Sequence, residues 1–303
     1  MKILLLGKNG QVGWELQRSL APLGEVVACD FDSPGALKAD FSQPESLRAL
    51  VRSLQPQIIV NAAAHTAVDK AESEPDFARA LNATAPGVVA EEAAALGATL
   101  VHYSTDYVFD GSGKEPRDED APTAPLSVYG RTKLEGEERV RGSGCTHLIL
   151  RTSWVYAARG GNFARTMLRL AAERESLNVI EDQIGAPTGA DLLADITALA
   201  LQRLQLQPQL GGTYHCVAGG QTSWHGYARH VIAWAHAHAN AQGQALKTTP
   251  EAVRAIPTSA YPTPAQRPMN SRLSTAKLQA AFGLRLPHWQ AGVERMLTEI
   301  TGR

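Results

Sequence analysis

A tyrosine and a lysine four residues apart, Tyr129 and Lys133, are the first candidates for chemistry in this chain. Two prolines, at 122 and 125, precede them, so we expect a helix to begin near Ser127, and helical spacing places both side chains on one face. A phenol with its ordinary pKa near about 10 exchanges protons poorly at neutral pH, and an adjacent ammonium lowers that pKa by stabilising the phenolate. The pair therefore predicts a general acid whose pKa is tuned by lysine.

Two hydroxyl groups, Ser104 and Thr105, follow the apolar run at 99–104 and complete this set of reactive side chains. Ligands of open parallel sheets bind where the strands end at their carboxyl side. A hydroxyl at that edge can hold a substrate oxygen while the tyrosine delivers a proton. We therefore expect a hydroxyl from this segment to face Tyr129.

Three glycines, Gly7, Gly10 and Gly13, follow the first apolar run and open a helical pattern. A plain turn explains one glycine, whereas three at this spacing suit a dinucleotide pyrophosphate, which needs a tight turn, close backbone approach and helix N–H groups. Asp30, at the end of the second apolar run, is placed to meet the adenosine ribose hydroxyls and favours NADH. Lys8 lies inside the glycine loop and can meet a 2′-phosphate, so NADPH stays open as the alternative.

The elements that must position these residues alternate along the first half of the chain. Short apolar runs at 2–7, 25–30, 57–64, 99–104 and 146–153 are separated by helical patterns, one of which begins with an S-x-x-E capping box from Ser42 to Glu45. This alternation predicts an α/β fold with a doubly wound parallel sheet. We expect residues 1–150 to form a dinucleotide-binding domain completed by parts of 175–220, and 151–303 to form mainly a smaller carboxyl-terminal substrate-binding lobe. Charged segment 110–125 is predicted to be an exposed loop, and segment 242–275 to be extended or loop-like.

Composition limits the classes of partner. The chain has 303 residues, 44% hydrophobic and 19% charged, with a formal net charge of −1. A chain of this composition is too apolar to be disordered. Its near-zero net charge gives no overall positive potential that would attract nucleic acid or an anionic membrane. The cysteines at 29, 145 and 216 form no ligand cluster, and no apolar run is long enough for a membrane span or a signal-peptide core, so we expect a cytoplasmic protein. Histidines at 225, 230, 236 and 238 lack helical pairing, which favours a partly exposed helix over a metal site.

Four motifs together resemble the extended short-chain dehydrogenase/reductase superfamily: GKNGQVG at 7–13, NAAA at 61–64, STD at 104–106 and YGRTK at 129–133. Within it, the chain is most similar to the branch that reduces the 4-keto group of a dTDP-linked 6-deoxy sugar, the last step of dTDP-L-rhamnose synthesis. Further matching segments, at 150–156, 182–195, 211–228 and 267–274, extend the resemblance over nearly the whole chain. The resemblance implies a Rossmann-type fold, NADPH or NADH as cofactor and a dTDP-sugar as substrate.

The resemblance also implies roles for individual residues. Tyr129 would donate the proton to the keto oxygen, Lys133 would tune it and contact the nicotinamide ribose, and Thr105 would orient the ketone. The residues expected at the cofactor, besides Tyr129 and Lys133, are Gly7, Gly10, Gln11, Val12, Gly13, Asp30, Asp40, Phe41, Ala63, Ala64, His65 and Thr66. Those expected at the substrate are Thr105, Asp106, Trp154, Arg267 and Asn270, although Trp154 also suits a core position.

Related activities remain as alternatives. A sugar-nucleotide dehydratase would need a glutamate after Asp106, where this chain has Tyr107, and an epimerase-reductase would need a nearby cysteine. A non-catalytic reading is a regulatory subunit similar to the β subunit of methionine adenosyltransferase. Some relatives dimerise through Mg²⁺, and Glu15, Asp191 and Glu294 are candidate ligands in a homodimer, although a solvated acidic face is the simpler interpretation.

Overall fold

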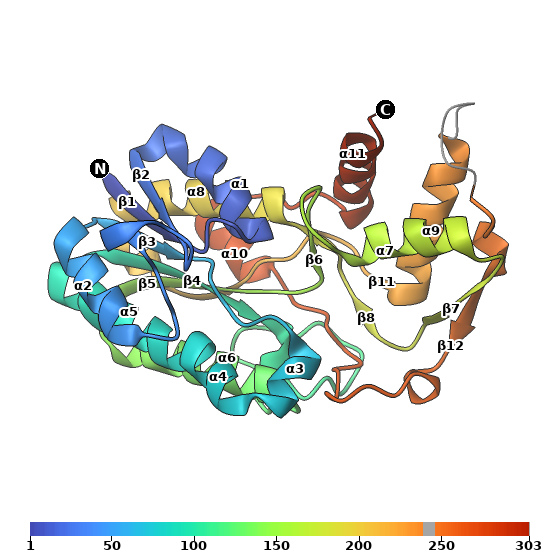
Figure 1. Cartoon of the computed structure of the whole chain (residues 1–303), viewed down its shortest axis with the longest axis horizontal. Coiled ribbons are helices and arrows are strands. Elements are labelled where there is room, and N and C mark those ends of the chain that lie inside the picture. The colour runs from blue at the N-terminus through green and yellow to red at the C-terminus, as the bar shows by residue number, and fades with distance from the viewer. Residues whose placement is uncertain (239–245, 303) are drawn as a thin grey trace.

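A parallel sheet forms the larger part of the molecule. The structure is a computed structural model that describes residues 1–238 and 246–302, and its six-stranded sheet has the order β10-β5-β4-β3-β1-β2 (Figure 1). The strands are β1 (Lys2–Leu6), β2 (Glu25–Cys29), β3 (Ile58–Asn61), β4 (Thr99–Thr105), β5 (Thr146–Thr152) and β10 (Gly212–His215). All five pairings are parallel, which confirms the predicted α/β architecture.

Helices cover both faces of this sheet because its central strands are apolar on both sides. Ile3 and Leu5 of β1 pack toward one cluster, whereas Leu4 and Leu6 pack toward the other. The helices on the first face are α1 (Gln11–Leu20), α8 (Ala190–Leu206) and α10 (Ala276–Phe282). Those on the second face are α2 (Pro44–Leu54), α5 (Ala85–Leu96) and α6 (Val128–Gly142), with the short helices α3 (Val68–Ser73) and α4 (Pro75–Arg79) beside α6.

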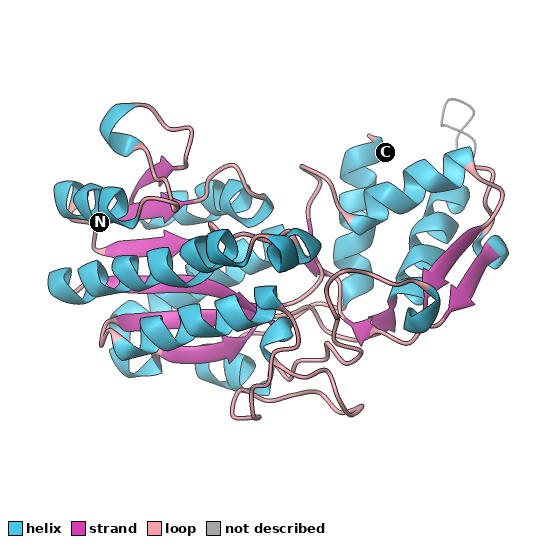
Figure 2. Ribbon diagram, turned by 60° about the horizontal axis from the view of Figure 1, so that its bottom comes forward, coloured by secondary structure: helices cyan, strands magenta, loops and turns pink. Residues whose placement is uncertain are grey.

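A second lobe has its own apolar core and lies beside the carboxyl ends of the strands (Figures 1 and 2). It contains α7 (Phe163–Glu173), α9 (Trp224–Ala237) and α11 (Trp289–Thr301), together with β7 (Leu177–Ile180) paired to β12 (Val253–Ile256). The short pairs β6 (Val155–Tyr156) with β9 (Thr188–Gly189) and β8 (Ile184–Gly185) with β11 (Thr222–Ser223) link it to the sheet. Because α8, β10 and α10 belong to the sheet layers, the two lobes alternate along the second half of the chain.

One local expectation, the capping box, is wrong. Helix α2 begins after Gln43, while the Ser42 hydroxyl donates to Asp40 at 2.6 Å and Glu45 pairs with Arg48. Proline at the first helical position, together with the Asp40 turn, starts this helix instead. Segment 242–275 is extended or loop-like over most of its described length, as expected, and its strand β12 pairs in parallel with β7; its residues 242–245 lie outside the described part of the chain.

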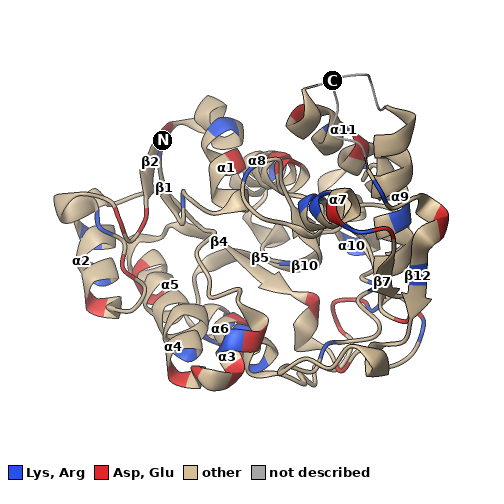
Figure 3. Ribbon diagram, turned by 45° about the vertical axis from the view of Figure 1, so that its right-hand side comes forward, with Lys and Arg blue, Asp and Glu red and all other residues tan. Residues whose placement is uncertain are grey.

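Basic and acidic side chains are interspersed over both lobes, as Figure 3 shows, in keeping with the net charge of −1. The histidines at 225, 230 and 236 lie on α9, whose buried face is formed by Tyr227, Ala228, Val231, Ile232 and Trp234. Within residues 1–238 and 246–302, no helix combines the length and the apolar character that crossing a membrane requires.

Candidate active site

The glycine turn connects β1 to α1 at the point where the strand order reverses, next to the carboxyl end of β3. Gly7 has a φ of +87°, and a β-carbon there would lie 2.6 Å from the Ala63 nitrogen. A β-carbon on Gly13 would lie 1.9 Å from the Gly7 carbonyl oxygen. Both positions therefore require glycine, and the turn packs tightly while the start of α1 faces outward.

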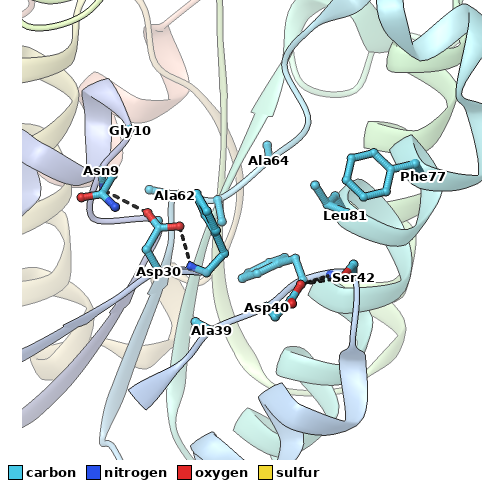
Figure 4. Close-up of a pocket in the computed structure, with 14 residues that line it drawn as sticks. Asn9, Gly10, Asp30, Ala39, Asp40, Ser42, Ala62, Ala64, Phe77 and Leu81 are labelled. Carbon is cyan, nitrogen blue, oxygen red and sulfur yellow. Dashed lines mark hydrogen bonds between the residues drawn. The ribbon is translucent and has the colours of Figure 1, made fainter. Parts of the chain in front are cut away.

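A cavity of about 540 Å³ opens in front of this turn (Figure 4). Of the residues predicted at the cofactor, those that line it are Gly7, Gly10, Asp30, Asp40, Phe41, Ala63 and Ala64. The lining also includes residues that the sequence reasoning missed, namely Asn9, Phe31, Ala39, Ser42, Ala62, Phe77 and Leu81. Phe31 is 65% exposed directly after Asp30, and an aromatic side chain at that position was a signal for a stacking surface.

Two carboxylates mark one end of the cavity. Asp30 accepts hydrogen bonds from the backbone N–H groups of Asn9 at 3.0 Å and Phe31 at 2.8 Å. Asp40 accepts from Ser42, and these bonds hold its pKa below the ordinary value. The described residues that line the cavity include no lysine or arginine, although Lys38 lies 3.4 Å from Asp40. This arrangement of glycine backbone, carboxylates and apolar side chains fits a dinucleotide whose adenosine ribose carries no 2′-phosphate.

His65 and Thr66 lie on the loop after β3, and a residue from another element holds this loop. The Asn82 amide accepts from the His65 N–H at 2.8 Å and donates to the His65 carbonyl at 3.1 Å. Asn82 lies in a π-helical stretch, Ala80–Thr84, which is a common feature of functional sites. The sequence did not single out Asn82, because the residues around it have the pattern of an ordinary α-helix. The buried Nδ1 of His65 has no partner, and Thr66 is exposed.

Tyr129, Thr105 and Asp106 come together at the carboxyl end of β4. The Ser127 hydroxyl caps α6 by accepting from the Gly130 N–H at 3.2 Å, which confirms the predicted helix start. Burial raises the pKa of Tyr129 to about 12, against the effect of its hydrogen bond with Thr105. The Thr105 hydroxyl donates to Asp106 Oδ1 at 3.1 Å.

The other Asp106 oxygen, Oδ2, is buried and has no hydrogen-bond partner among the described residues. Burial raises the pKa of this carboxyl to about 6. A buried acceptor without a partner is rare in folded proteins, and a bound water molecule or ligand is one way to satisfy it.

Lys133 is buried behind this group. Its Nζ donates to the Tyr103 carbonyl at 2.6 Å and lies 3.5 Å from His102 Nε2. Burial lowers the pKa of Lys133 to about 8. The expected lowering of the Tyr129 pKa by Lys133 is wrong for the free chain: burial raises the pKa, and the opposing effect comes from the hydrogen bond with Thr105.

Trp154 follows β5 directly and has a left-handed backbone conformation with φ of +51°. Such a conformation is strained for an aromatic residue and is maintained by its surroundings. Its ring stacks on Trp224 of α9 with centroids 3.7 Å apart and planes at 17°, and Gly185 leaves room beneath it. Trp154 as a whole is half-buried.

The two residues predicted at the diphosphate have partners within the chain. Arg267 forms a bidentate pair with Asp69 of α3, at 2.8 and 3.0 Å, which joins the two lobes. The Asn270 amide donates to the carbonyls of Ser112 and Glu115 and fixes the charged loop. Gln11 also bridges the lobes by donating to the carbonyl of Gly161 at 3.1 Å, while Val12 packs against the core.

The three carboxylates proposed as magnesium ligands each lie near a basic group. Glu15 is 3.7 Å from Arg18, Asp191 is 3.6 Å from Arg295 and Glu294 is 3.3 Å from His230. Within the described part of the chain, no three acidic, histidine or cysteine side chains form a group that could hold a metal ion. One copy of the chain therefore does not assemble the predicted magnesium site.

Comparisons with known proteins agree with this geometry. The family model described as "RmlD substrate binding domain" matches residues 1–301. Curated proteins named dTDP-4-dehydrorhamnose reductase are 57% identical in Salmonella typhimurium and 56% identical in Shigella flexneri, each over 99% of this chain and 98% of the relative.

Solved structures share the fold over nearly the full length. A dTDP-4-dehydrorhamnose reductase from Clostridium acetobutylicum superposes with a TM-score of 0.87 at 33% identity, covering 99% of each chain. The enzyme of the same name from Bacillus anthracis, in complex with NADP, has a TM-score of 0.85 at 33% identity, covering 98% of this chain and 99% of the other.

Proposed function

The chain belongs to the RmlD substrate binding domain family, and on that basis we propose that it reduces the 4-keto group of dTDP-4-dehydro-6-deoxy-L-mannose to give dTDP-L-rhamnose. It is a nicotinamide-dependent oxidoreductase of the kind named dTDP-4-dehydrorhamnose reductase. The observation that carries the proposal is the convergence of Tyr129, Thr105 and Asp106 at the strand edge beside the glycine-turn cavity.

The lobes divide the work in this proposal. The sheet lobe holds the cofactor against the glycine turn, with Asp30 and Asp40 near the adenosine and Ala63 to Thr66 along its inner part. The second lobe recognises the sugar nucleotide through Trp154, with Arg267 and Asn270 nearby. The ion pair of Arg267 with Asp69 supports a role for Arg267 in positioning the loop that carries it. A contact with the diphosphate would require this ion pair to open, or Arg267 to bind Asp69 and the diphosphate together.

The reduced nicotinamide supplies the hydride when it is bound. Tyr129, which is protonated at neutral pH, then donates its phenolic proton to the keto oxygen. The Thr105 hydroxyl orients the ketone, and Asp106 holds the hydroxyl through its Oδ1. Lys133 contacts the nicotinamide ribose and returns a proton toward Tyr129, a role supported by its pKa of about 8.

The cofactor pocket is compatible with either NADH or NADPH, and the solved relative from Bacillus anthracis is a complex with NADP. Asp30 and Asp40 line the adenosine end, and a carboxylate there accepts hydrogen bonds from ribose hydroxyls but repels a 2′-phosphate. Lys38, paired with Asp40, is the cation that would offset this repulsion. Steady-state kinetics with each cofactor tests the preference.

Two alternatives are less favoured. Elimination of water needs an acid and base pair after Thr105, whereas here Tyr107 follows Asp106 and packs edge-on against Tyr129 with centroids 5.4 Å apart. A purely regulatory subunit would not need the buried Thr105 hydroxyl, the buried Lys133 amine and the half-buried Tyr129 phenol that this chain has.

Following NAD(P)H loss with the 4-keto sugar nucleotide tests the function directly. Tyr129→Phe removes the proton donor and keeps the ring, so we expect kcat to fall about 10²- to 10⁴-fold with an unchanged fold. Tyr261→Phe, at a site that is 59% exposed, is the matched control and should leave kcat unchanged. Full turnover by the Tyr129→Phe variant would refute the assigned mechanism.

A homodimer is a further part of the proposal. Glu15, Asp191 and Glu294 lie on α1, α8 and α11, and the proximity of Asp191 helps raise the pKa of Glu15. Light scattering with and without a chelator tests both the dimer and its dependence on a divalent cation. A monomer under both conditions would exclude this part.

A further inference from the structure

Three buried polar side chains form a contact series beneath the active site, and the proposed mechanism uses only the last of them. Asn61, His102 and Lys133 are 1%, 1% and 2% exposed. Asn61 and His102 are register partners on the parallel strands β3 and β4, and Asn61 Nδ2 lies 3.1 Å from His102 Nδ1. His102 Nε2 lies 3.5 Å from Lys133 Nζ.

The orientation of the Asn61 amide is fixed by the backbone. Its Oδ1 accepts from the Ala63 N–H at 3.1 Å, because only the oxygen of the amide can accept there. The Nδ2 group must then donate to His102 Nδ1, which leaves that ring nitrogen unprotonated. Burial keeps the pKa of His102 well below its ordinary value, so the ring is neutral and carries its proton on Nε2.

The proton on His102 Nε2 points toward the Lys133 amine. If that amine is a charged ammonium, it can only donate, so two N–H donors face each other, whereas a neutral amine accepts a hydrogen bond from His102. Lys133 has a second contact, the Tyr103 carbonyl at 2.6 Å, which accepts from either form and holds the amine in place.

We propose that Asn61 and His102 are positioning residues that fix the imidazole tautomer facing Lys133 and thereby set the proton occupancy of that amine. This inference rests on the proposed function for its catalytic meaning and adds to it the residues that prepare the lysine. Asn61 also connects the amine to the cofactor cavity, because Ala63, which it binds, lines that cavity.

Few charged or titratable groups face the Lys133 amine. Besides His102 of β4, Glu137 one turn along α6 raises the pKa of Lys133. Glu137 is in turn neutralised by a buried bidentate pair with Arg151 of β5, at 2.7 and 2.8 Å, and by Arg141 at 2.9 Å. Tyr129 lies one turn earlier on α6 and stays protonated near neutral pH, so His102 is the group nearest to the amine whose tautomer can change.

A long-range ¹H–¹⁵N correlation spectrum of the free chain tests the tautomer without depending on activity. We assign the His102 signals by their loss in His102→Gln and expect the neutral Nε2–H pattern from pH 6 to 8. Asn61→Leu removes the fixed donor and should convert the ring to the Nδ1–H tautomer, which lets Nε2 accept from the ammonium. An Nδ1–H tautomer or an imidazolium in the unaltered chain would overturn the proposal.

The pH dependence of kcat/KM for NADH tests the effect on the amine, since this ratio reports the ionisations of the free enzyme. Asn61→Leu removes the fixed donor and with it the opposed His102 N–H, so the limb at high pH should move up by about one unit. For a limb that moves from about 8 to about 9, activity at pH 9 relative to pH 7 rises about fivefold.

His147→Gln is the control, because this histidine lies on β5 of the same sheet and, among the described residues, its side chain bonds only to the Cys145 carbonyl. Its profile should coincide with that of the unaltered chain. An unshifted profile for folded Asn61→Leu would refute the proposal. An unaltered chain without reductase activity would instead refute the proposed function, and the tautomer measurement would still decide the role of His102.

Discussion

Alanine at Gly13 and at Gly10 should separate the folding role of the glycine turn from its binding role. A β-carbon on Gly13 would lie 1.9 Å from the Gly7 carbonyl oxygen, whereas the same atom on Gly10 would lie 3.4 Å from it. A carbon atom cannot stay 1.9 Å from the Gly7 carbonyl oxygen, so Gly13→Ala must push α1 away from the turn until that distance is about the 3.4 Å found for Gly10. Gly10→Ala fits without movement and places its methyl group at the helix start that faces the cavity.

The expected magnitudes follow from these distances. Overpacking of this kind costs about 1–3 kcal/mol of unfolding free energy, or more where the obstructing atom is backbone. At about 2–4 °C per kcal/mol for a domain of this size class, Gly13→Ala should lower Tm by about 2–12 °C. Gly10→Ala should leave Tm unchanged and weaken NADH binding about tenfold or more, a loss of about 1.4 kcal/mol.

Thermal unfolding followed by circular dichroism and cofactor binding followed by protein fluorescence provide the two readouts. Gly97→Ala is a poor control because Gly97 has a φ of +65°, whereas Gly142, with open space around its β-carbon and on a helix, is a suitable one. An unchanged Tm for Gly13→Ala would show that the turn is looser than described. Unchanged NADH affinity for Gly10→Ala would show that the pyrophosphate lies elsewhere.

Three further outcomes are expected. Asp30→Asn removes the charge that disfavours a 2′-phosphate, so the ratio of kcat/KM for NADPH to that for NADH should rise, and an unchanged ratio would remove Asp30 from the adenosine site. Asp106 has a pKa of about 6 in the fold against an ordinary 3.8, so the native state binds more protons between these values and loses stability as the pH rises through them. Asp106→Asn should therefore raise the unfolding free energy of the free chain by up to about 3 kcal/mol at pH 7, as measured by urea titration. The unfolding free energy of this variant should also change less with pH, and a steeper change would contradict the reasoning. Glu137→Gln leaves buried Arg151 without its carboxylate and should cost about 3 kcal/mol in the same titrations; Arg141→Ala, a more exposed partner of that carboxylate, should cost less than about 1 kcal/mol.

Two hydrogen-bonded contacts join the lobes. Arg267 with Asp69 joins the second lobe to α3, and Gln11 joins the glycine turn to the loop before α7. Both bridges begin at residues expected to contact a ligand. Binding of cofactor or sugar nucleotide would therefore act on the same contacts that hold the lobes together.

Local patterns in the sequence determined the fold class and the main reactive groups. Continuous apolar runs specify buried parallel strands, three glycines specify a tight turn, and the spacing of Tyr129 and Lys133 specifies one helix face. Each of these depends on neighbours within a few residues, which the sequence displays directly. The α/β sheet, its strands and the start of α6 were accordingly predictable.

Only the tertiary structure decided what surrounds those groups. Asn61, His102 and Lys133 meet because β3 and β4 lie in register and α6 covers them, and Trp154 stacks on Trp224 from another lobe. Such contacts join residues distant in sequence and leave no local period to read. Burial also depends on the whole fold, and burial has the largest effect on the pKa of Tyr129.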